Sequence, residues 1–480
     1  WRSSMMANAA RDPYWQAGVR RETMDHAPAA AAIEDKCATC HMPMARYLAH
    51  LGGASGSVFA HLPAGRAATP AALLAHDGVS CAVCHQIEGD NLDTPASFTG
   101  GFVVDHGNAL GERVVFGPFA VDSGRQRIMR SASGFEPTEG SHVRSSALCG
   151  SCHTLYTHAL DADGNEVGEL PEQTPYLEWR HSAYNGERSC QDCHMPAVEG
   201  ETAVTGVLGE RRSDVSRHVF RGGNFLMPRL LNRYRDELGV VALPQELEAT
   251  AARSAEHLRT NSATLMVQRP TVAGGMLTFG VLVRNLAGHK LPTAYPSRRA
   301  WLHVTVQDDE DRVVFESGRL RRNGSIVGND NDDDPARYEP HHARIDGPEL
   351  VQVYEAVMEH YAGGPTTGLL NGVGYLKDNR LLPRGFDKAS ADPDVAVYGA
   401  AERDDDFGGG ADVVRYAIDV TGGTAPFTIE VELLYQPISF RWAQNLTAYD
   451  APEPRRFVRY YDSMAGATHE RLATATRTVP

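Results

Sequence analysis

The stretch Cys37-Ala-Thr-Cys40-His41 is the first of four copies of one short pattern in this chain. Each copy places two cysteines three positions apart and puts a histidine directly after the second cysteine. The other copies are Cys81-Ala-Val-Cys84-His85, Cys149-Gly-Ser-Cys152-His153 and Cys190-Gln-Asp-Cys193-His194. Together they use all 8 cysteines of the 480 residues, so the organisation of this region depends on what the four turns bind.

The pattern is the attachment signature of a c-type haem. On one helical turn the two thiols can form thioether bonds to the vinyl groups of the porphyrin. The adjacent histidine then lies under the iron as its proximal ligand. The sequence therefore predicts four covalent haems c, with His41, His85, His153 and His194 as proximal ligands.

Other uses of paired cysteines fit this pattern less well. A zinc site closes around two cysteine pairs and has no need of a histidine after every pair. A disulfide framework does not repeat a single spacing four times, and a thioredoxin-like redox site is one motif. Because haem is attached covalently outside the bacterial cytoplasm, we expect an exported protein, periplasmic or extracellular. The start at Trp1 is expected for a mature form whose signal peptide has been removed.

Composition excludes several other classes of protein. Hydrophobic residues are 42% and charged residues 22% of the chain, which is typical of globular proteins and not of disordered or collagen-like ones. The net charge is -15 and no block of lysine and arginine occurs, so we expect no nucleic-acid or anionic-membrane partner. No apolar run reaches the length of about 18 residues that a membrane span requires.

We expect an α+β multidomain protein. A mostly helical or irregular tetrahaem domain is predicted over 1–235, because its segments between motifs are rich in glycine, proline and alanine and lack a regular apolar period. A helical linker with a break near Pro244 follows over 236–262. An antiparallel, immunoglobulin-like β-sandwich is predicted over 263–480.

Within these domains several elements can be predicted. Helices are expected at each attachment turn and over 174–186, and a hairpin over 154–170. Its turn at Asp161-Ala-Asp163-Gly164-Asn165 lacks the spacing and the closing glutamate of a calcium loop. Strands are expected over 264–269, 276–285, 300–307, 312–317, 413–420 and 427–436. A loop-like insert over 360–412 and a closing helix over 453–464 complete the second half.

The occupant of each iron's sixth position separates an electron carrier from a catalyst. The strongest distal candidates are His142, seven residues before the third motif, and His218, whose neighbours Gly222 and Gly223 let the backbone approach a flat macrocycle. Further candidates are His76, His289, His61 and His341. His26 and His181 are expected at the surface. Met42 and Met195 directly follow proximal histidines and are expected to pack. The acidic run Asp330 to Asp334 can bind calcium or form a solvated loop, which we favour.

Several stretches besides the motifs carry a family resemblance. They are Gly78-Val79-Ser80, His142 with Ser145 and Ser146, Glu172-Gln173-Thr174-Pro175-Tyr176 with Glu178-Trp179, and His218 to Asn224. With them the first half resembles the multihaem c-type cytochromes related to the tetrahaem electron carrier of hydroxylamine oxidoreductase. The second half resembles the C-terminal domain of larger bacterial relatives through Gly288-His289-Lys290, Pro292-Thr293 and Pro296-Ser297-Arg298-Arg299. The resemblance implies mostly bis-histidine haems within electron-hopping distance, and some relatives form extracellular filaments.

We therefore predict an electron carrier in preference to an enzyme. The alternative is an oxidoreductase that acts on a small nitrogen or sulfur compound at a five-coordinate haem. The expected partners are redox proteins or further copies of the chain. We also expect the β half to dock onto a partner, with His289 or His341 completing the coordination of a haem.

Overall fold

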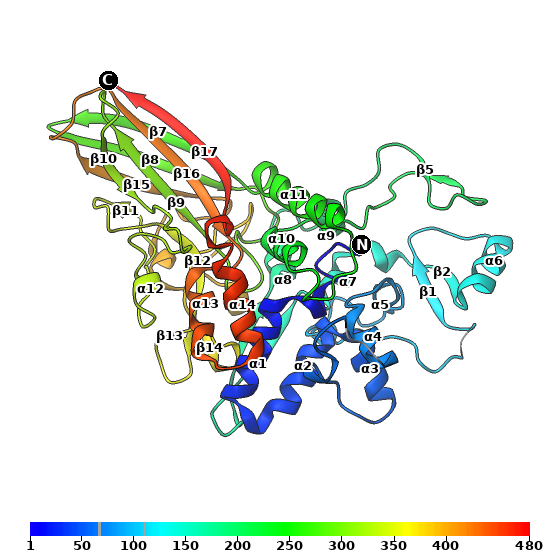
Figure 1. The fold of residues 1–480 in the computed structure, drawn as a ribbon. Helices are drawn as coiled ribbons and strands as arrows, with labels where there is room; N and C mark the ends of the chain where they lie inside the picture. Colours follow the sequence, from blue (N-terminus) through cyan, green and yellow to red (C-terminus); the bar gives the residue numbers. More distant parts are fainter. Residues whose placement is uncertain (66–68, 110) are drawn as a thin grey trace.

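The computed structural model describes residues 1–65, 69–109 and 111–480. Residues 1–235, here called the N-terminal half, consist of short helices and three two-stranded sheets. Residues 263–480, the C-terminal half, contain two larger sheets that lie to one side of these helices (Figure 1). The chain thus has the mixed α+β architecture that the sequence predicted.

Short helices carry all four cysteine motifs. The helices of the N-terminal half are α1 (Pro13–Asp25), α2 (Ala30–His41), α3 (Pro43–Leu51), α4 (Pro70–His76), α5 (Cys81–Cys84), α6 (Ser123–Ser133), α7 (Ser146–Gly150), α8 (Pro175–Arg180), α9 (Cys190–His194) and α10 (Leu226–Arg233). The motifs lie at the end of α2, in α5, at the end of α7 and in α9. Helix α8 is shorter than the expected 174–186, because the Ser182 hydroxyl accepts the Tyr184 N–H and turns the chain.

The predicted hairpin is present as β3 (Leu155–Leu160) and β4 (Glu166–Gln173), paired antiparallel. Asp161 Oδ1 accepts the backbone N–H groups of Asp163 and Asn165 at 3.0 and 2.8 Å, which makes this segment a side-chain-stabilised turn. The other small sheets pair β1 (Val114–Gly117) with β2 (Glu136–Glu139) and β5 (Thr202–Ala203) with β6 (Arg211–Arg212).

The predicted linker is helical only in its second part, because residues 236–243 form turns and irregular chain. Helix α11 (Pro244–Asn261) begins at Pro244, whose fixed φ and missing N–H suit the first helical position. The buried face of α11 includes Leu247, Ala251 and Leu258.

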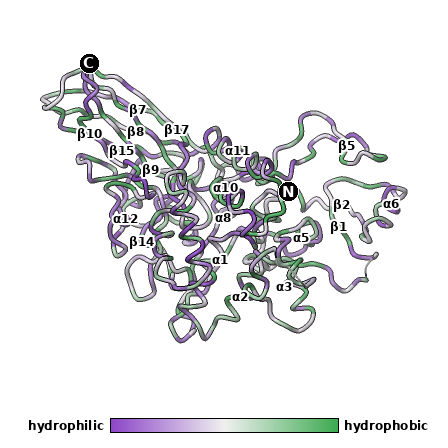
Figure 2. The backbone as a smooth tube through the Cα atoms, viewed as in Figure 1, coloured by the Kyte–Doolittle hydropathy of each residue, from purple (hydrophilic) through white to green (hydrophobic). Residues whose placement is uncertain are grey.

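Two sheets form the C-terminal half and share one apolar core. The larger sheet has the order β13-β12-β9-β16-β17, with β10 paired to β9 and β14 to β12, and the smaller has the order β11-β15-β8-β7. Alternate residues of β8, β9, β15 and β16 are buried in the same core, among them Val281, Val304, Val414 and Val431. Figure 2 shows that the strands of this half contain both hydrophobic and hydrophilic residues.

The strands of this half lie close to their predicted positions. They are β7 (Ala263–Ala273), β8 (Met276–Asn285), β9 (Arg299–Gln307), β10 (Val313–Ser317), β11 (Arg344–Ile345), β12 (Val353–His360), β13 (Pro365–Thr366), β14 (Gly372–Asp378), β15 (Ala411–Asp419), β16 (Phe427–Gln436) and β17 (Glu470–Val479). The six predicted strands correspond to β7, β8, β9, β10, β15 and β16.

Parts of the C-terminal half differ from expectation, whereas its closing helix agrees with it. The segment 360–412 is not only loop, because β14 within it pairs with β12. β17 was not predicted, since its polar and small residues hide its alternation. The expected closing helix is α14 (Pro452–Asp462), preceded by α13 (Phe440–Asn445) and packed against α1 at the other end of the chain (Figure 1).

The acidic run Asp330 to Asp334 overlaps the short helix α12 (Asp330–Asp333). Its carboxylates contact arginines: Asp332 pairs with Arg299 at 2.8 Å in the interior, and Asp333 pairs with Arg321 at 2.9 Å. Among the described residues, no helix has the length and apolar character needed to cross a membrane.

Candidate functional site

Backbone carbonyls fix the ring orientation of three of the four predicted proximal histidines. Nδ1 of His41, His85 and His194 lies 3.1, 2.6 and 2.5 Å from the carbonyl oxygens of Ala9, Phe116 and Arg221. A neutral imidazole that donates its proton through Nδ1 keeps the lone pair of Nε2 available, which is how a metal-bound histidine is usually fixed. Burial lowers the pKa of His41 and of His194 to about 4, so both rings are neutral.

Two proximal histidines face a second imidazole at the spacing that one metal ion requires. Two imidazoles that bind one metal from opposite sides, each through a bond of about 2.0 Å, have ring centroids roughly 6 Å apart. The rings of His85 and His218 are 6.0 Å apart, and those of His194 and His289 are 6.2 Å apart. These donor sets fit haem iron with two axial histidines.

The attachment turns also lie next to one another. The Ser146 hydroxyl in α7 accepts the Cys190 N–H of the fourth motif at 3.0 Å. Gly100 donates its N–H to the Ser151 carbonyl of the third motif at 2.8 Å, and a Cβ placed on Gly100 would lie 3.6 Å from Cys40 Sγ of the first. None of the cysteines forms a disulfide. The first, third and fourth motifs therefore lie close to one another, and haems attached to them would be neighbours.

Apolar space adjoins the first two motifs. A cavity of about 240 Å³ lies between them and is lined by Thr39, Met44, Tyr47, Ala82 and Val83, among others. Thr39 lies within the first motif and Ala82 and Val83 lie within the second, so both attachment turns border it.

His289 is held against the N-terminal half by a buried network of charges. Glu178 Oε2 of α8 accepts the Lys290 N–H at 3.1 Å and the Thr293 hydroxyl at 2.5 Å, on either side of the cis Leu291–Pro292 bond. Glu178 Oε1 pairs with Arg380 at 2.8 Å, and Asp378 pairs with both Arg380 and Lys290, at 2.6 and 2.7 Å. Against the effect of burial, these two cations lower the pKa of Asp378 to about 2.

His257 of α11 was missed by the sequence analysis. Its ring lies 6.0 Å from that of His194, with the two planes at 65°. Its Nδ1 is buried and has no hydrogen-bond partner among the described residues. The helical period of 244–261 places this histidine on α11, but only the tertiary fold brings it to the fourth motif.

The remaining candidate ligands differ in which ring nitrogen is available. His142 Nε2 lies 2.8 Å from the Ile87 carbonyl, and His76 Nε2 lies 2.5 Å from the carbonyl of His61. His26 is buried, so its expected surface position is wrong. Its Nδ1 lies 2.9 Å from the Asp161 carbonyl, and its Nε2 makes no hydrogen bond to any described residue but lies 4.0 Å from Glu22 Oε2. His181 is partly exposed beside Asp392, as expected.

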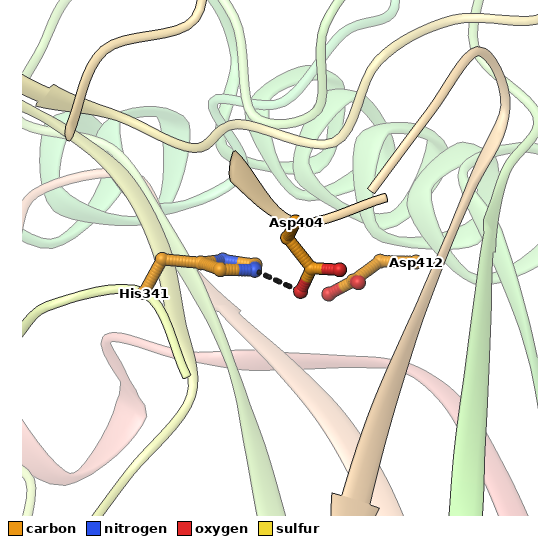
Figure 3. A group of neighbouring side chains, drawn as sticks. All are labelled: His341, Asp404 and Asp412. Atoms are coloured by element: carbon orange, nitrogen blue, oxygen red, sulfur yellow. Dashed lines mark hydrogen bonds and ion pairs between the residues drawn. The ribbon is translucent and has the colours of Figure 1, made fainter. Parts of the chain in front are cut away.

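His341 lies in the C-terminal half beside Asp404 and Asp412 (Figure 3). Its Nδ1 is 2.8 Å from the side-chain nitrogen of Gln352 and 3.1 Å from that of Asn379. Both amides are oriented by their oxygens, which accept the backbone N–H groups of His342 and Glu355. Nδ1 is therefore an acceptor, and the proton lies on Nε2, which donates to Asp404 at 3.1 Å.

This hydrogen-bond pattern determines what the trio can hold. With a proton on Nε2 and two donors at Nδ1, His341 has no free lone pair for a metal ion. This arrangement disfavours His341 as a haem ligand. Burial raises the pKa of Asp412 to about 7, so this carboxyl is partly protonated at neutral pH.

The fold of the chain is related to that of a solved multihaem cytochrome. The chain is similar to the penta-haem cytochrome c552 from Thermochromatium tepidum, with a TM-score of 0.52, 15% sequence identity, and coverage of 92% of this chain and 83% of that one. No protein-family model and no curated protein sequence matches the chain.

Proposed function

We propose that the protein carries electrons through four covalently bound haems c. The observation that carries this proposal is the pairing of His85 with His218 and of His194 with His289 at 6.0 and 6.2 Å, each directly beside a complete attachment motif. Two axial histidines leave the iron no open position for a substrate, which favours electron transfer over catalysis.

The protein's own residues would attach the haems and orient their ligands. Haem c, when bound, supplies one-electron chemistry at its iron. The eight cysteine thiols attach the four groups, and backbone carbonyls keep Nε2 of His41, His85 and His194 available. The proximity of the first, third and fourth motifs supports electron movement among the haems attached to them. Export to the periplasm or beyond, redox-protein partners and assembly with further copies belong to the same proposal.

Two measurements test the proposal. Mass spectrometry of the denatured holoprotein should show four haem additions, and fewer additions or free thiols would contradict it. The EPR spectrum of the oxidised protein should be dominated by low-spin signals. Changing His218 to Ala should convert one of these to high-spin without loss of haem, while the exposed His158→Ala should change nothing.

One observation favours the second candidate, an oxidoreductase acting on a small nitrogen or sulfur compound. Within the described ranges, no histidine ring stands opposite His41 or His153 at the spacing of the two pairs. His153 is exposed in the structure. A high-spin EPR signal in the unmodified holoprotein, perturbed by nitrite or sulfite, would support this second function.

A further inference from the structure

Two polar side chains of the C-terminal half meet beside the stretch 217–224. A Cβ atom placed on Gly223 would lie 2.7 Å from Tyr435 Oη and 3.8 Å from Arg298 Nη1. The absence of a side chain at Gly223 therefore leaves both groups facing the same space. Gly223 is two residues from Arg221, whose carbonyl holds the proximal His194.

Both side chains lack the partners that such groups usually have. Tyr435 is only 1% exposed, and its Oη has no hydrogen-bond partner among the described residues. Arg298 is half-buried and donates from Nη1 to the Thr293 carbonyl at 3.0 Å. No carboxylate in the described part of the chain lies within ion-pair distance of it, whereas its neighbour Arg299 pairs with Asp332.

A guanidinium has five donors in a planar fork that matches a carboxylate or another oxyanion. A half-buried cation and a buried phenol that face one space are stabilised when an anion accepts from both. The pair lies close to a predicted iron ligand, because a Cβ placed on Gly222, the residue before Gly223, would lie 3.9 Å from His194 Nδ1.

We propose that Arg298 and Tyr435 form a binding site for a carboxylate or small oxyanion beside the third and fourth motifs. The occupant we favour is a propionate of the haem attached to one of these motifs, and this inference rests on the proposed function. Each haem brings two carboxylates, and one placed in the interior requires cationic and hydrogen-bonding partners. A free oxyanion has the same recognition chemistry and is the other possible source.

Redox titration of the holoprotein tests the propionate. Arg298→Gln should lower the midpoint potential of one haem, because a nearby positive charge is lost. It should also make that potential depend on pH across the neutral range, because the unpaired propionate now titrates. Tyr435→Phe should give a smaller shift, and Arg298→Lys should restore most of the potential. Arg319→Gln, which changes an exposed arginine, should leave every potential unchanged.

Addition of sodium nitrite or sodium sulfite to the oxidised holoprotein tests the other source. A change in the Soret spectrum that requires Arg298 would assign the site to a free oxyanion. If neither variant alters a potential or its pH dependence, and neither salt gives an Arg298-dependent spectrum, the anion site is refuted. Haem content measured by mass separates this result from failure of the proposed function, which would show fewer than four haems.

Discussion

His289 and His257 both lie about 6 Å from the ring of His194, yet they differ in how they are held. His289 Nδ1 is 2.8 Å from the Lys290 carbonyl, which fixes the ring and leaves Nε2 available. His257 Nδ1 has no partner, so nothing in the described structure selects its tautomer. A histidine with one anchored nitrogen loses less freedom on binding a metal. We therefore propose that His289, and not His257, would be the distal ligand of the haem held by His194.

The corresponding prediction compares two alanine variants of the holoprotein. His289→Ala should convert one low-spin haem to high-spin. If His257 replaces His289 as ligand, the EPR g-values of that haem should shift instead, because the ring plane of His257 lies at 65° to that of His194 and the ring plane of His289 at 13°. His257→Ala should leave the EPR spectrum unchanged. An altered spectrum in His257→Ala together with an unaltered one in His289→Ala would reverse the assignment.

Asp412 shows how a single buried group makes stability depend on pH. Burial raises its pKa in the folded protein from 3.8 to about 7. The stability this group contributes is complete below pH 4 and is lost as the pH rises towards 7, by up to about 4 kcal/mol. His341, whose pKa burial lowers to about 4, acts in the opposite direction, losing stability as the pH falls through the same range. The two effects are separated by changing Asp412 alone.

Asp412→Asn should therefore gain stability relative to the unmodified protein as the pH rises from 5 to 8. Urea unfolding midpoints of both proteins at each pH measure the difference. Asp387→Asn serves as the matched control. Asp387 lies at an exposed turn, and hydrogen bonds lower the pKa of its carboxyl. Parallel pH profiles for Asp412→Asn and the unmodified protein would show that Asp412 does not keep a proton near neutral pH.

Helix α8 and the turn at 288–293 act as one unit across the two halves. Glu178 is fully buried and binds the backbone of Lys290 and the hydroxyl of Thr293, the residues that follow His289. Removing its charge leaves Arg380 without one of its two carboxylate partners and loosens the turn. Glu187 also joins the halves, through Arg384 at 2.5 Å, but this pair is exposed and screened by solvent.

We predict that Glu178→Gln increases the high-spin fraction at one haem and broadens its low-spin EPR signal, because His289 is positioned less uniformly. Glu187→Gln should change neither. EPR at several temperatures, together with haem content by mass, measures both variants. Glu178→Asp should retain part of the low-spin signal, since it keeps the charge. Identical spectra in Glu178→Gln and Glu187→Gln would show that the network stabilises the fold without positioning His289.

At this scale the sequence was informative wherever the signal was local. The four attachment turns, the break at Pro244 and the alternating strands β8, β9 and β16 depend on neighbouring residues and were predictable. β17 and β14 were not, because strand pairing with β16 and β12 stabilises segments whose own pattern is weak. The same holds for the site. His218 was predicted from its glycines, while His257 and the buried position of His26 depend on which segments the fold brings together.

The N-terminal and C-terminal halves pack against each other through apolar and charged contacts. Helix α1 packs against α14, and Arg20 of α1 pairs with Glu453 of α14 at 2.8 Å (Figure 1). Phe225, Leu226 and Leu230 of the N-terminal half are buried in the same core as the strands of the C-terminal half. Separating the halves would expose this apolar surface and the buried charges around Glu178, both of which are unfavourable.

We therefore expect the holoprotein to unfold in one transition, although multidomain chains often unfold stepwise. Guanidinium unfolding followed by tryptophan fluorescence, far-UV circular dichroism and the Soret band should give coincident midpoints, because α1, α10 and α14 couple the halves. Leu230 is fully buried in the shared core. Replacing it with Ala should lower the free energy of unfolding by about 2–5 kcal/mol and should therefore shift all three midpoints together to lower guanidinium concentration. The exposed Leu73→Ala provides the control. A Soret transition that separates from the other two, or that does not move in Leu230→Ala, would show that the haem-bearing half folds independently of the sheets.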